Sequence, residues 1–233
     1  MSRLRYSTTE SSRTRGEAPE TIKRIALRLF AERGVDGVTV REIAAAAGQK
    51  NHGAVGYYFG TKEALVREIV ADGAKIIDDR RNAMLDELEA RGTPVTMREM
   101  VDAIIYPSLE PFDNGTDDCY MRFVVMLTMT HRDLFNDAIG NRWNTGYQRC
   151  LAHLRRLMPP IASHLKNQRL MFLGSYLAMM MGLRQTALSD TTRAHSTWSS
   201  QQTLDHLAST AVDMLAGPEP EASVPPTFPP SGG

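Results

Sequence analysis

The sequence predicts an all-α protein, with a small N-terminal three-helix domain followed by a larger helical domain. Apolar residues recur at helical spacing through most of the chain, and no segment shows sustained alternation of apolar and polar residues. Glycine, proline and helix-capping residues separate the periodic runs. The 233 residues are enough to bury a core in each domain.

The first helix is expected to begin near residue 18, because Pro19 suits a first helical turn, where an N–H has no partner within the helix. Its apolar face repeats at helical spacing, with Ile22, Ile25, Ala26, Leu29 and Phe30, and Gly34 and Gly37 follow as stop signals. Residues 1–17 are rich in Ser, Thr and Arg and are interpreted as a flexible basic arm. Such an arm either lies along a minor groove of DNA or makes no contact.

Two short helices joined by a turn are expected next. Thr39 and Glu42 have the spacing of a capping box, in which the threonine hydroxyl accepts from an N–H three residues on and the glutamate reaches back. The helix that they open ends at Gly48. The following segment, Asn51 to Tyr58, is poor in large aliphatics and rich in groups that bind nucleic acid. Residues 18–66 are therefore expected to form a helix-turn-helix domain, which places a helix in the major groove of DNA.

Several motifs in this segment match a known pattern: Thr39-Val40-Arg41-Glu42-Ile43-Ala44, Ala47-Gly48, Ala54-Val55 and Tyr57-Tyr58-Phe59-Gly60-Thr61-Lys62-Glu63-Ala64-Leu65. With them, roughly the first third of the chain resembles the TetR family of bacterial transcriptional regulators. The resemblance implies an N-terminal DNA-binding domain and a divergent helical domain that binds a small molecule and dimerises. Gly56 departs from the pattern, since many members carry a phosphate-contacting tyrosine there, and Tyr57 and Tyr58 are the expected replacements.

The candidate DNA-binding residues fall into three groups by chemistry. Phosphate contacts are expected from Thr39, Arg41 and Lys62, and from the hydroxyls of Tyr57 and Tyr58. Base-edge contacts are expected from Lys50 toward guanine, Asn51 toward adenine, and His52. Gln49 is expected to assist from the turn.

The charge distribution fits this assignment, although the formal net charge of the chain is zero. Through Arg67 the sequence holds twelve Lys and Arg residues against seven Asp and Glu, an excess of five positive charges. The remainder therefore carries five net negative charges. A basic head on an acidic body is expected when only one end of a protein meets phosphate.

The larger domain is expected over residues 67–216, with a disordered tail over 217–233. Helices are expected at about 61–91, 96–109, 117–130, 132–157 with a break near Gly140, 160–189 and 199–216. The last two are the expected dimer interface, with stripes at Leu165, Phe172, Leu173, Tyr176, Leu177, Met180 and Leu183 on one and Ala208, Ala211, Val212 and Leu215 on the other. The alternative is that these stripes face the core of their own subunit.

A mostly apolar ligand pocket is expected in this domain, because eleven of the 13 methionines follow residue 95 and aromatic residues accompany them. The candidate pocket residues are Tyr106, Met121, Met126, Met129, Trp143, Tyr147, Phe172 and Tyr176. The alternative for each residue taken singly is ordinary core packing.

The sequence holds no set of residues that would make an enzyme. His131-Arg132-Asp133-Leu134 is spelled like a kinase catalytic loop but lacks the asparagine and glycine-rich loop that belong with it. The six histidines show no metal-ligand spacing, so we expect neither a metal nor a cofactor. Two cysteines predict reduced thiols, with a redox-sensing pair as the alternative. Without a signal peptide or a span of about 20 apolar residues, a cytoplasmic location with no membrane contact is expected.

These observations predict a homodimeric, sequence-specific DNA-binding transcriptional regulator. We expect a repressor that a small, mostly apolar effector releases from a palindromic operator in double-stranded DNA. Two alternatives remain: a small-molecule-binding protein whose head no longer reads DNA, and an architectural DNA binder without an effector.

Overall fold

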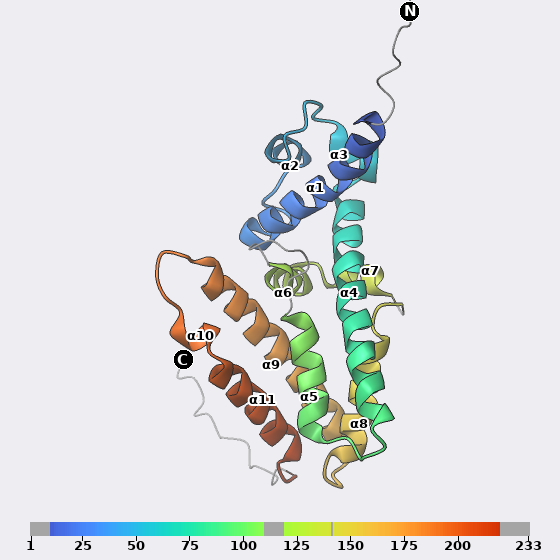
Figure 1. Cartoon of the computed structure of the whole chain (residues 1–233), viewed down its shortest axis with the longest axis vertical. Coiled ribbons are helices and arrows are strands. Elements are labelled where there is room, and N and C mark those ends of the chain that lie inside the picture. Colours follow the sequence, from blue (N-terminus) through green and yellow to red (C-terminus); the bar gives the residue numbers. More distant parts are fainter. Residues whose placement is uncertain (1–9, 110–118, 141, 220–233) are drawn as a thin grey trace, which may run out of the picture.

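The computed structural model describes residues 10–109, 119–140 and 142–219. Within these ranges the chain forms eleven α-helices, one 3-10 turn and no strand, which confirms the all-α prediction. Figure 1 shows α1–α3 at one end and the remaining helices around the long helix α4, which runs away from them. The bounds are α1 Glu10–Arg33, α2 Val40–Ala46, α3 Ala54–Phe59, α4 Lys62–Ala90, α5 Met97–Ile105, η1 Tyr106–Ser108, α6 Tyr120–Thr130, α7 Arg132–Ile139, α8 Thr145–Leu157, α9 Ser163–Ser189, α10 Ser196–Ser199 and α11 Gln201–Ala216.

Helix α1 begins earlier than the sequence indicated. Residues 10–17, predicted as part of a flexible arm, form its first turns, and Pro19 stands inside the helix. A proline in a helix removes one N–H donor but keeps a helical φ, so the polar residues before it can continue the helix. Residues 1–9 of the predicted arm and 220–233 of the predicted tail lie outside the described residues.

Helix α4 is the axis on which the other helices are fixed. The ring of Tyr120, at the start of α6, lies against Gly73, where an added methyl group would fall within the ring. The Tyr120 hydroxyl donates to the carbonyl oxygen of Val70 at 2.8 Å, and both the ring and Gly73 are buried. Only a glycine at position 73 allows α6 to approach α4 this closely.

A buried pair of charged residues on α4 orders α5 and α8. Asp78 accepts from the backbone N–H groups of Thr145 and Gly146 at 3.1 and 2.8 Å, so that it caps the N-terminus of α8. Arg81, one turn later, donates to the carbonyl oxygens of Ala103 and Ile104 at 3.0 and 3.1 Å, at the end of α5. Both side chains are nearly inaccessible to water, at 4 % and 7 % exposure. Their hydrogen bonds offset the cost of burying charge and fix three helices in register.

The molecule has two apolar cores. The first joins α1–α3 and the upper part of α4 to α6 and α7, and the rings of Phe30 and Phe123 stack in it with centroids 6.0 Å apart. The second lies among the lower part of α4 and helices α5, α8, α9 and α11. Cys119 belongs to the first core and Cys150 to the second, so the two buried cysteines do not form a disulfide with each other. Burial raises the pKa of the Cys150 thiol to about 11, which keeps it protonated.

The observed helix boundaries refine several predictions. The helix expected over 96–109 is α5 followed by the 3-10 turn η1, with Pro107 inside that turn. The break expected near Gly140 separates α7 from α8, and Gly140 has a positive φ of 51°. The short helix α10 was not predicted.

No helix within the described ranges has the length and apolar content needed to cross a membrane.

Candidate nucleic-acid interface

The predicted capping box opens α2. Thr39 has an extended backbone, and its hydroxyl oxygen accepts from the N–H of Glu42 at 3.2 Å. The Glu42 carboxylate accepts in return from the Thr39 N–H at 2.8 Å and from Arg33 Nη1 at 2.9 Å. These bonds, the backbone one foremost, lower the pKa of Glu42 to about 2. The Thr39 hydroxyl, predicted to bind phosphate, is therefore engaged in the cap.

The turn between α2 and α3 is held by its own side chains. Gly48 has a φ of 67°, which the chain requires in order to leave α2. Gln49 Nε2 donates to the carbonyl oxygen of Ala47 at 3.2 Å, and Asn51 Oδ1 accepts from the N–H of Gly53 at 2.9 Å. Gln49 and Asn51 thus shape the turn, although both were predicted to face DNA.

Helix α3 is shorter than predicted. It spans Ala54–Phe59, so that the predicted base-reading residues Lys50, Asn51 and His52 precede it in the turn. Ala54, Val55 and Phe59 are buried and anchor the helix to the first core. The opposite side presents Tyr57, whose side chain is 75 % exposed, and its ring meets that of Tyr58 edge-on at 4.9 Å between centroids.

Lys62, at the start of α4, has partners that the sequence did not indicate. Its Nζ donates to the carbonyl oxygens of Val35 and Val38 at 2.9 and 3.2 Å, and the side chain is half-buried. Lys62 thereby ties α4 to the loop between α1 and α2. Its predicted phosphate contact competes with these two bonds.

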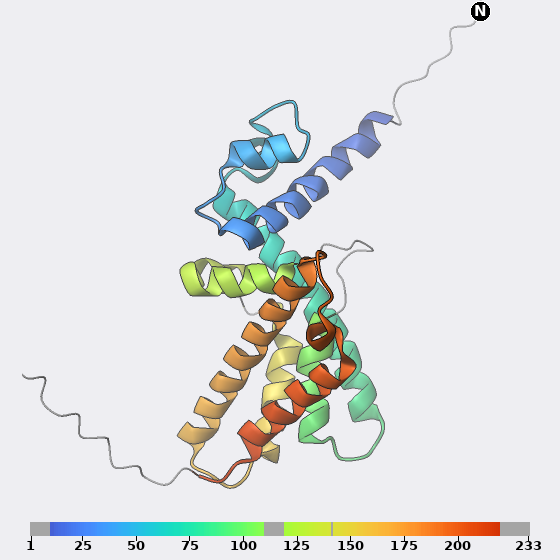
Figure 2. The same cartoon turned by 90° about the vertical axis from the view of Figure 1, so that its left-hand side faces the viewer.

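Six of the nine predicted residues are exposed, and two of these, Thr39 and Asn51, already bond to the backbone around the turn. The other four are Arg41 on α2, Lys50 and His52 in the turn, and Tyr57 on α3. Figure 2 shows this segment at the end of the molecule farthest from α9 and α11. It offers two fixed positive charges, an imidazole and a phenol on a surface supported by a rigid core, which suits contact with phosphate and base edges.

Charged and polar contacts that no sequence pattern indicated join the head to the body and α4 to α7. Lys23 on α1 pairs with Asp72 on α4, and Arg67 on α4 lies 3.5 Å from Asp137 on α7. His131, between α6 and α7, has Nε2 at 3.3 Å from Oδ1 of Asp36. Each pair joins residues that are distant in the sequence, and no local spacing predicts such contacts.

The eight residues predicted to line a ligand pocket lie at several separate places in the described structure. Met129 and Phe172 are exposed at 76 % and 51 %, and Tyr106 bonds through its hydroxyl to Gln201 Nε2 at 2.7 Å. Tyr147 and Tyr176 pack against the second core, Met121 contacts both cores, and the Trp143 ring lies 5.5 Å from Lys75 Nζ. Of the eight, Met126 alone lines the larger groove described next. Helical periodicity identifies an apolar face but does not indicate which side chains meet at a void.

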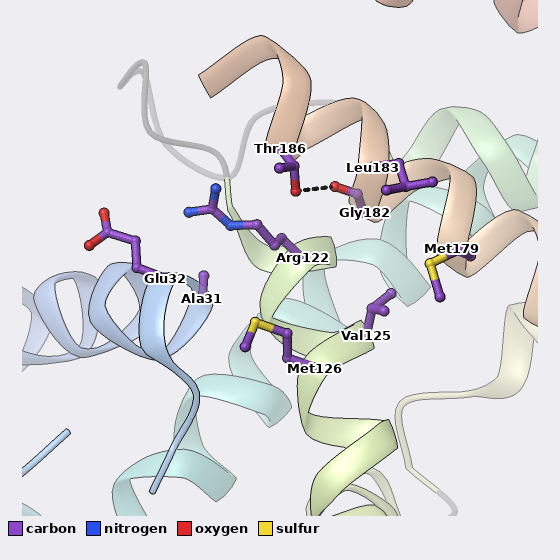
Figure 3. A pocket seen from close by; sticks show the side chains of 9 residues that line it. All are labelled: Ala31, Glu32, Arg122, Val125, Met126, Met179, Gly182, Leu183 and Thr186. Atoms are coloured by element: carbon purple, nitrogen blue, oxygen red, sulfur yellow. Dashed lines mark hydrogen bonds between the residues drawn. The ribbon is translucent and has the colours of Figure 1, made fainter. Parts of the chain in front are cut away.

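The described part of the molecule has grooves at both ends of the body. The larger has a volume of about 410 Å³ and lies between α1, α6 and α9, lined by Ala31, Glu32, Arg122, Val125, Met126, Met179, Gly182, Leu183 and Thr186 (Figure 3). The smaller, about 350 Å³, is at the opposite end of the body and is lined by Glu89, Thr93, Pro94, Val95, His153, Arg156 and Leu157. Among the described residues, no three His, Cys, Asp or Glu side chains gather as a metal site would require.

Part of the predicted dimer stripe is buried within the subunit. Leu173 and Leu177 of α9, and Ala208, Ala211 and Leu215 of α11, belong to the second core. On α9, Met171 and Phe172 face outward with 60 % and 51 % of their side chains exposed. The outward face of α9 is therefore the part of the predicted interface that is open to a second subunit.

Comparison with known proteins points to one family. Residues 23–69 match the family model described as bacterial regulatory proteins, tetR family. The TetR-family transcriptional regulator PfmR from Thermus thermophilus superposes with a TM-score of 0.53 at 16% identity, over 85% of this chain and 99% of that one. A TetR-family protein from a Rhodococcus species superposes with a TM-score of 0.50 at 13% identity, over 86% and 100%. At these identities the likeness is one of fold. No curated protein matches the chain in sequence.

Proposed function

We propose that this chain, which belongs to the TetR family of DNA-binding transcriptional regulators, is a homodimeric repressor that a small, mostly apolar effector releases from a palindromic operator. One observation carries the proposal: a capped helix-turn-helix with a buried anchor presents Arg41, Lys50, His52 and Tyr57 to solvent. Members of such a family act by binding and not by catalysis. Because a bacterial operator lies in the cytoplasm, the proposed function is a cytoplasmic one.

The exposed side chains divide by chemistry into two roles. Arg41 and Tyr57 contact phosphates and set the register of the protein on the duplex. Lys50 and His52 reach base edges from the turn that leads into α3, with the lysine ammonium directed to guanine O6 and N7. The bonds of Thr39, Gln49, Asn51 and Lys62 hold these groups in place.

The regulatory step is a shift between two spacings of the paired heads. Successive major grooves on one side of the duplex are about 34 Å apart, so a dimer binds tightly only when its two α3 helices match that distance. An effector that binds better to the mismatched arrangement releases the operator, and its preference between the two states limits the shift. Helix α4, which carries the head and is fixed to α5 and α8 through Arg81 and Asp78, transmits the change.

Selection on random duplex DNA at about 0.15 M salt tests this function. The expected result is an enriched inverted repeat, with half-site centres about one helical turn, or a multiple of it, apart. Lys50→Ala should relax preference at one base pair by about 1–3 kcal/mol and leave the other positions unchanged. A folded dimer that enriches no sequence would overturn the proposal. Salt-dependent binding without preference would indicate an architectural role, and no DNA binding would indicate a sensor.

A further inference from the structure

The larger groove lies where the head meets the body. Ala31 and Glu32 of α1 form one side, Arg122, Val125 and Met126 of α6 form the floor, and the upper part of α9 forms the other side (Figure 3). Gly182 allows α9 to approach α6 closely beside the groove: a methyl group added there would lie 3.2 Å from Val125 Cγ2. Most of the lining is apolar.

Arg122, which lines this groove, has a side-chain N–H without a hydrogen-bond acceptor. Its Nη1 donates to Ser189 Oγ at 3.2 Å, and its backbone N–H donates to Gln185 Oε1 at 3.0 Å. Its Nε is shielded from water and has no hydrogen-bond partner. A buried donor without an acceptor is unfavourable, so a ligand that supplies an acceptor to this guanidinium binds more favourably.

Glu32 faces Arg122 across the groove (Figure 3), and the balance between these two charges decides the sign of the ligand. The Glu32 side chain is 47% exposed and lies 3.9 Å from Arg28 Nε, so water and a neighbouring cation already stabilise its charge. The half-buried Arg122 has an unsatisfied donor. The site therefore favours an anion, and a planar carboxylate fits the guanidinium fork.

We propose that this groove binds a monocarboxylate with an apolar chain. The carboxylate bonds to Arg122, and the chain lies along Val125, Met126, Met179 and Leu183. The inference rests on the proposed function, because it assigns a site and a chemical class to the effector of that function. Both parts of the ligand contribute: the ion pair with Arg122 orients the ligand, and burial of its apolar chain adds affinity.

The position of the groove explains how occupancy could reach the head. Met126 extends from the groove toward the end of α1, where a methyl group added at Gly34 would lie 3.7 Å from Met126 Cε. A ligand in contact with Ala31, Glu32 and Met126 therefore touches the head and the body at once. Its binding energy depends on how α1 sits on α6, which is the condition for a ligand to shift head positions.

Calorimetric titration of the full-length protein with sodium decanoate, and with decan-1-ol as its uncharged counterpart, tests the site. Decanoate is expected to bind wild type, and decan-1-ol at least tenfold more weakly. Arg122→Gln should weaken decanoate binding by about tenfold to a hundredfold. Glu32→Gln should strengthen it by about twofold to fivefold, because a repulsive charge is removed. The control Arg156→Gln, which removes an arginine from the smaller groove, should leave binding unchanged.

Opposite effects from Arg122→Gln and Glu32→Gln cannot both arise from misfolding, so the pair remains informative if one variant is destabilised. Equal binding of decanoate and decan-1-ol, or no effect of Glu32→Gln in a folded protein, would overturn the proposal. Equal losses from Arg156→Gln and Arg122→Gln would also overturn it.

A second titration separates this inference from the proposed function. The enriched duplex from the DNA selection is followed by fluorescence anisotropy with and without decanoate. Decanoate should raise the dissociation constant of wild type for the duplex, and Arg122→Gln should abolish that response while keeping DNA affinity. Sequence-specific DNA binding that ignores decanoate would overturn the inference and leave the proposed function standing. Decanoate binding without any enriched duplex would overturn the function.

Discussion

Lys62 provides a test of whether a basic residue at the interface serves the fold or the DNA. Its two bonds to the carbonyl oxygens of Val35 and Val38 hold the start of α4 against the loop before α2. Lys62→Met should lower the free energy of unfolding by about 1–3 kcal/mol, because two carbonyl oxygens lose a charged donor. The slope of log K against log salt for DNA binding should stay the same, since no phosphate contact is lost. Urea unfolding and binding isotherms at several salt concentrations measure both.

Lys50→Met is the matched control, because Lys50 is exposed and no hydrogen bond or ion pair involves it in the described structure. Its unfolding free energy should change by less than about 0.5 kcal/mol. If the Lys50 ammonium contacts a phosphate as well as a base, Lys50→Met should reduce the magnitude of the slope of log K against log salt by about 0.9. The reverse pattern, a stable Lys62→Met with a reduced slope, would show that Lys62 binds DNA.

Glu42 makes the capping box sensitive to acid. Its folded pKa of about 2 lies below the ordinary value of 4.5, because Thr39 and Arg33 bond to the ionised form. Stabilisation by a group with a depressed pKa is complete above its unfolded pKa and is lost as the pH falls through the folded value. Wild type should therefore be more stable than Glu42→Gln at pH 7, and the difference should shrink below about pH 4.5. Urea midpoints of the two proteins at pH 7, 5, 4 and 3 give the comparison, and a gap that widens on acidification would contradict this account.

Individual roles around the turn show what a sequence can and cannot indicate. The spacing of Thr39 and Glu42 predicted their cap, because both partners lie within one helical turn. Asn51 and Gln49 have side chains that suit bases equally well, yet they bond to the backbone of their own turn. Residue type defines which bonds a side chain can make, whereas the local backbone path decides which partner is nearest.

At the scale of the element, Gly48 and Gly56 of the helix-turn-helix both have open space around them and differ in backbone conformation. An added methyl group would meet no atom within 4 Å at either Gly48 or Gly56, but Gly48 has a φ of 67° and Gly56 lies within α3. Gly56→Ala should therefore raise the unfolding free energy by about 0.5–1 kcal/mol. Gly48→Ala should lower it by about 1–2 kcal/mol, because alanine is strained at that φ. Equal effects of the two substitutions in urea unfolding would show that backbone conformation is not the cause.

The helix boundaries that were predicted well carry local signals, and those that were missed do not. Thr61 and Thr96 cap α4 and α5, and Gly140 separates α7 from α8. Pro19 led to a predicted helix start near residue 18 that is wrong, because α1 already begins at Glu10 and Pro19 lies within it. Helix α10 has four residues and no buried side chain, so no periodicity could reveal it.

At the scale of the whole molecule, we expect two subunits to dimerise through the outward face of α9. Phe172 is 51 % exposed there, beside Met171 at 60 %. Phe172→Glu should raise the dimer dissociation constant by about thirtyfold or more, which corresponds to about 2 kcal/mol for a central aromatic residue. Sedimentation velocity over a range of concentrations measures it. Leu157 is also apolar and is 38 % exposed, but it lies on α8 and lines the smaller groove. Leu157→Glu is therefore the control, and it should leave the dimer intact. A dimer that tolerates Phe172→Glu would place the interface elsewhere.

The residues of the candidate DNA interface are adjacent in the sequence, whereas those of the groove are not. The interface lies within one continuous segment, residues 39–62, so its parts are adjacent in the chain. The groove joins Ala31, Arg122 and Leu183 from three helices. Its existence depends on how α1, α6 and α9 pack, which includes the contact that Gly182 permits with Val125. Such a void is a property of tertiary packing, and no spacing along one helix encodes it.

The first apolar core has a consequence for anyone who wishes to graft this DNA-binding head onto another regulator. Phe30 of α1 stacks on Phe123 of α6, and Leu127 and Ala138 complete the same core. A chimera joined at residue 66 would expose these side chains on both fragments or set them against foreign partners. The transplantable unit is therefore discontinuous: it comprises α1–α3, the upper part of α4, and the face of α6 and α7 that they cover.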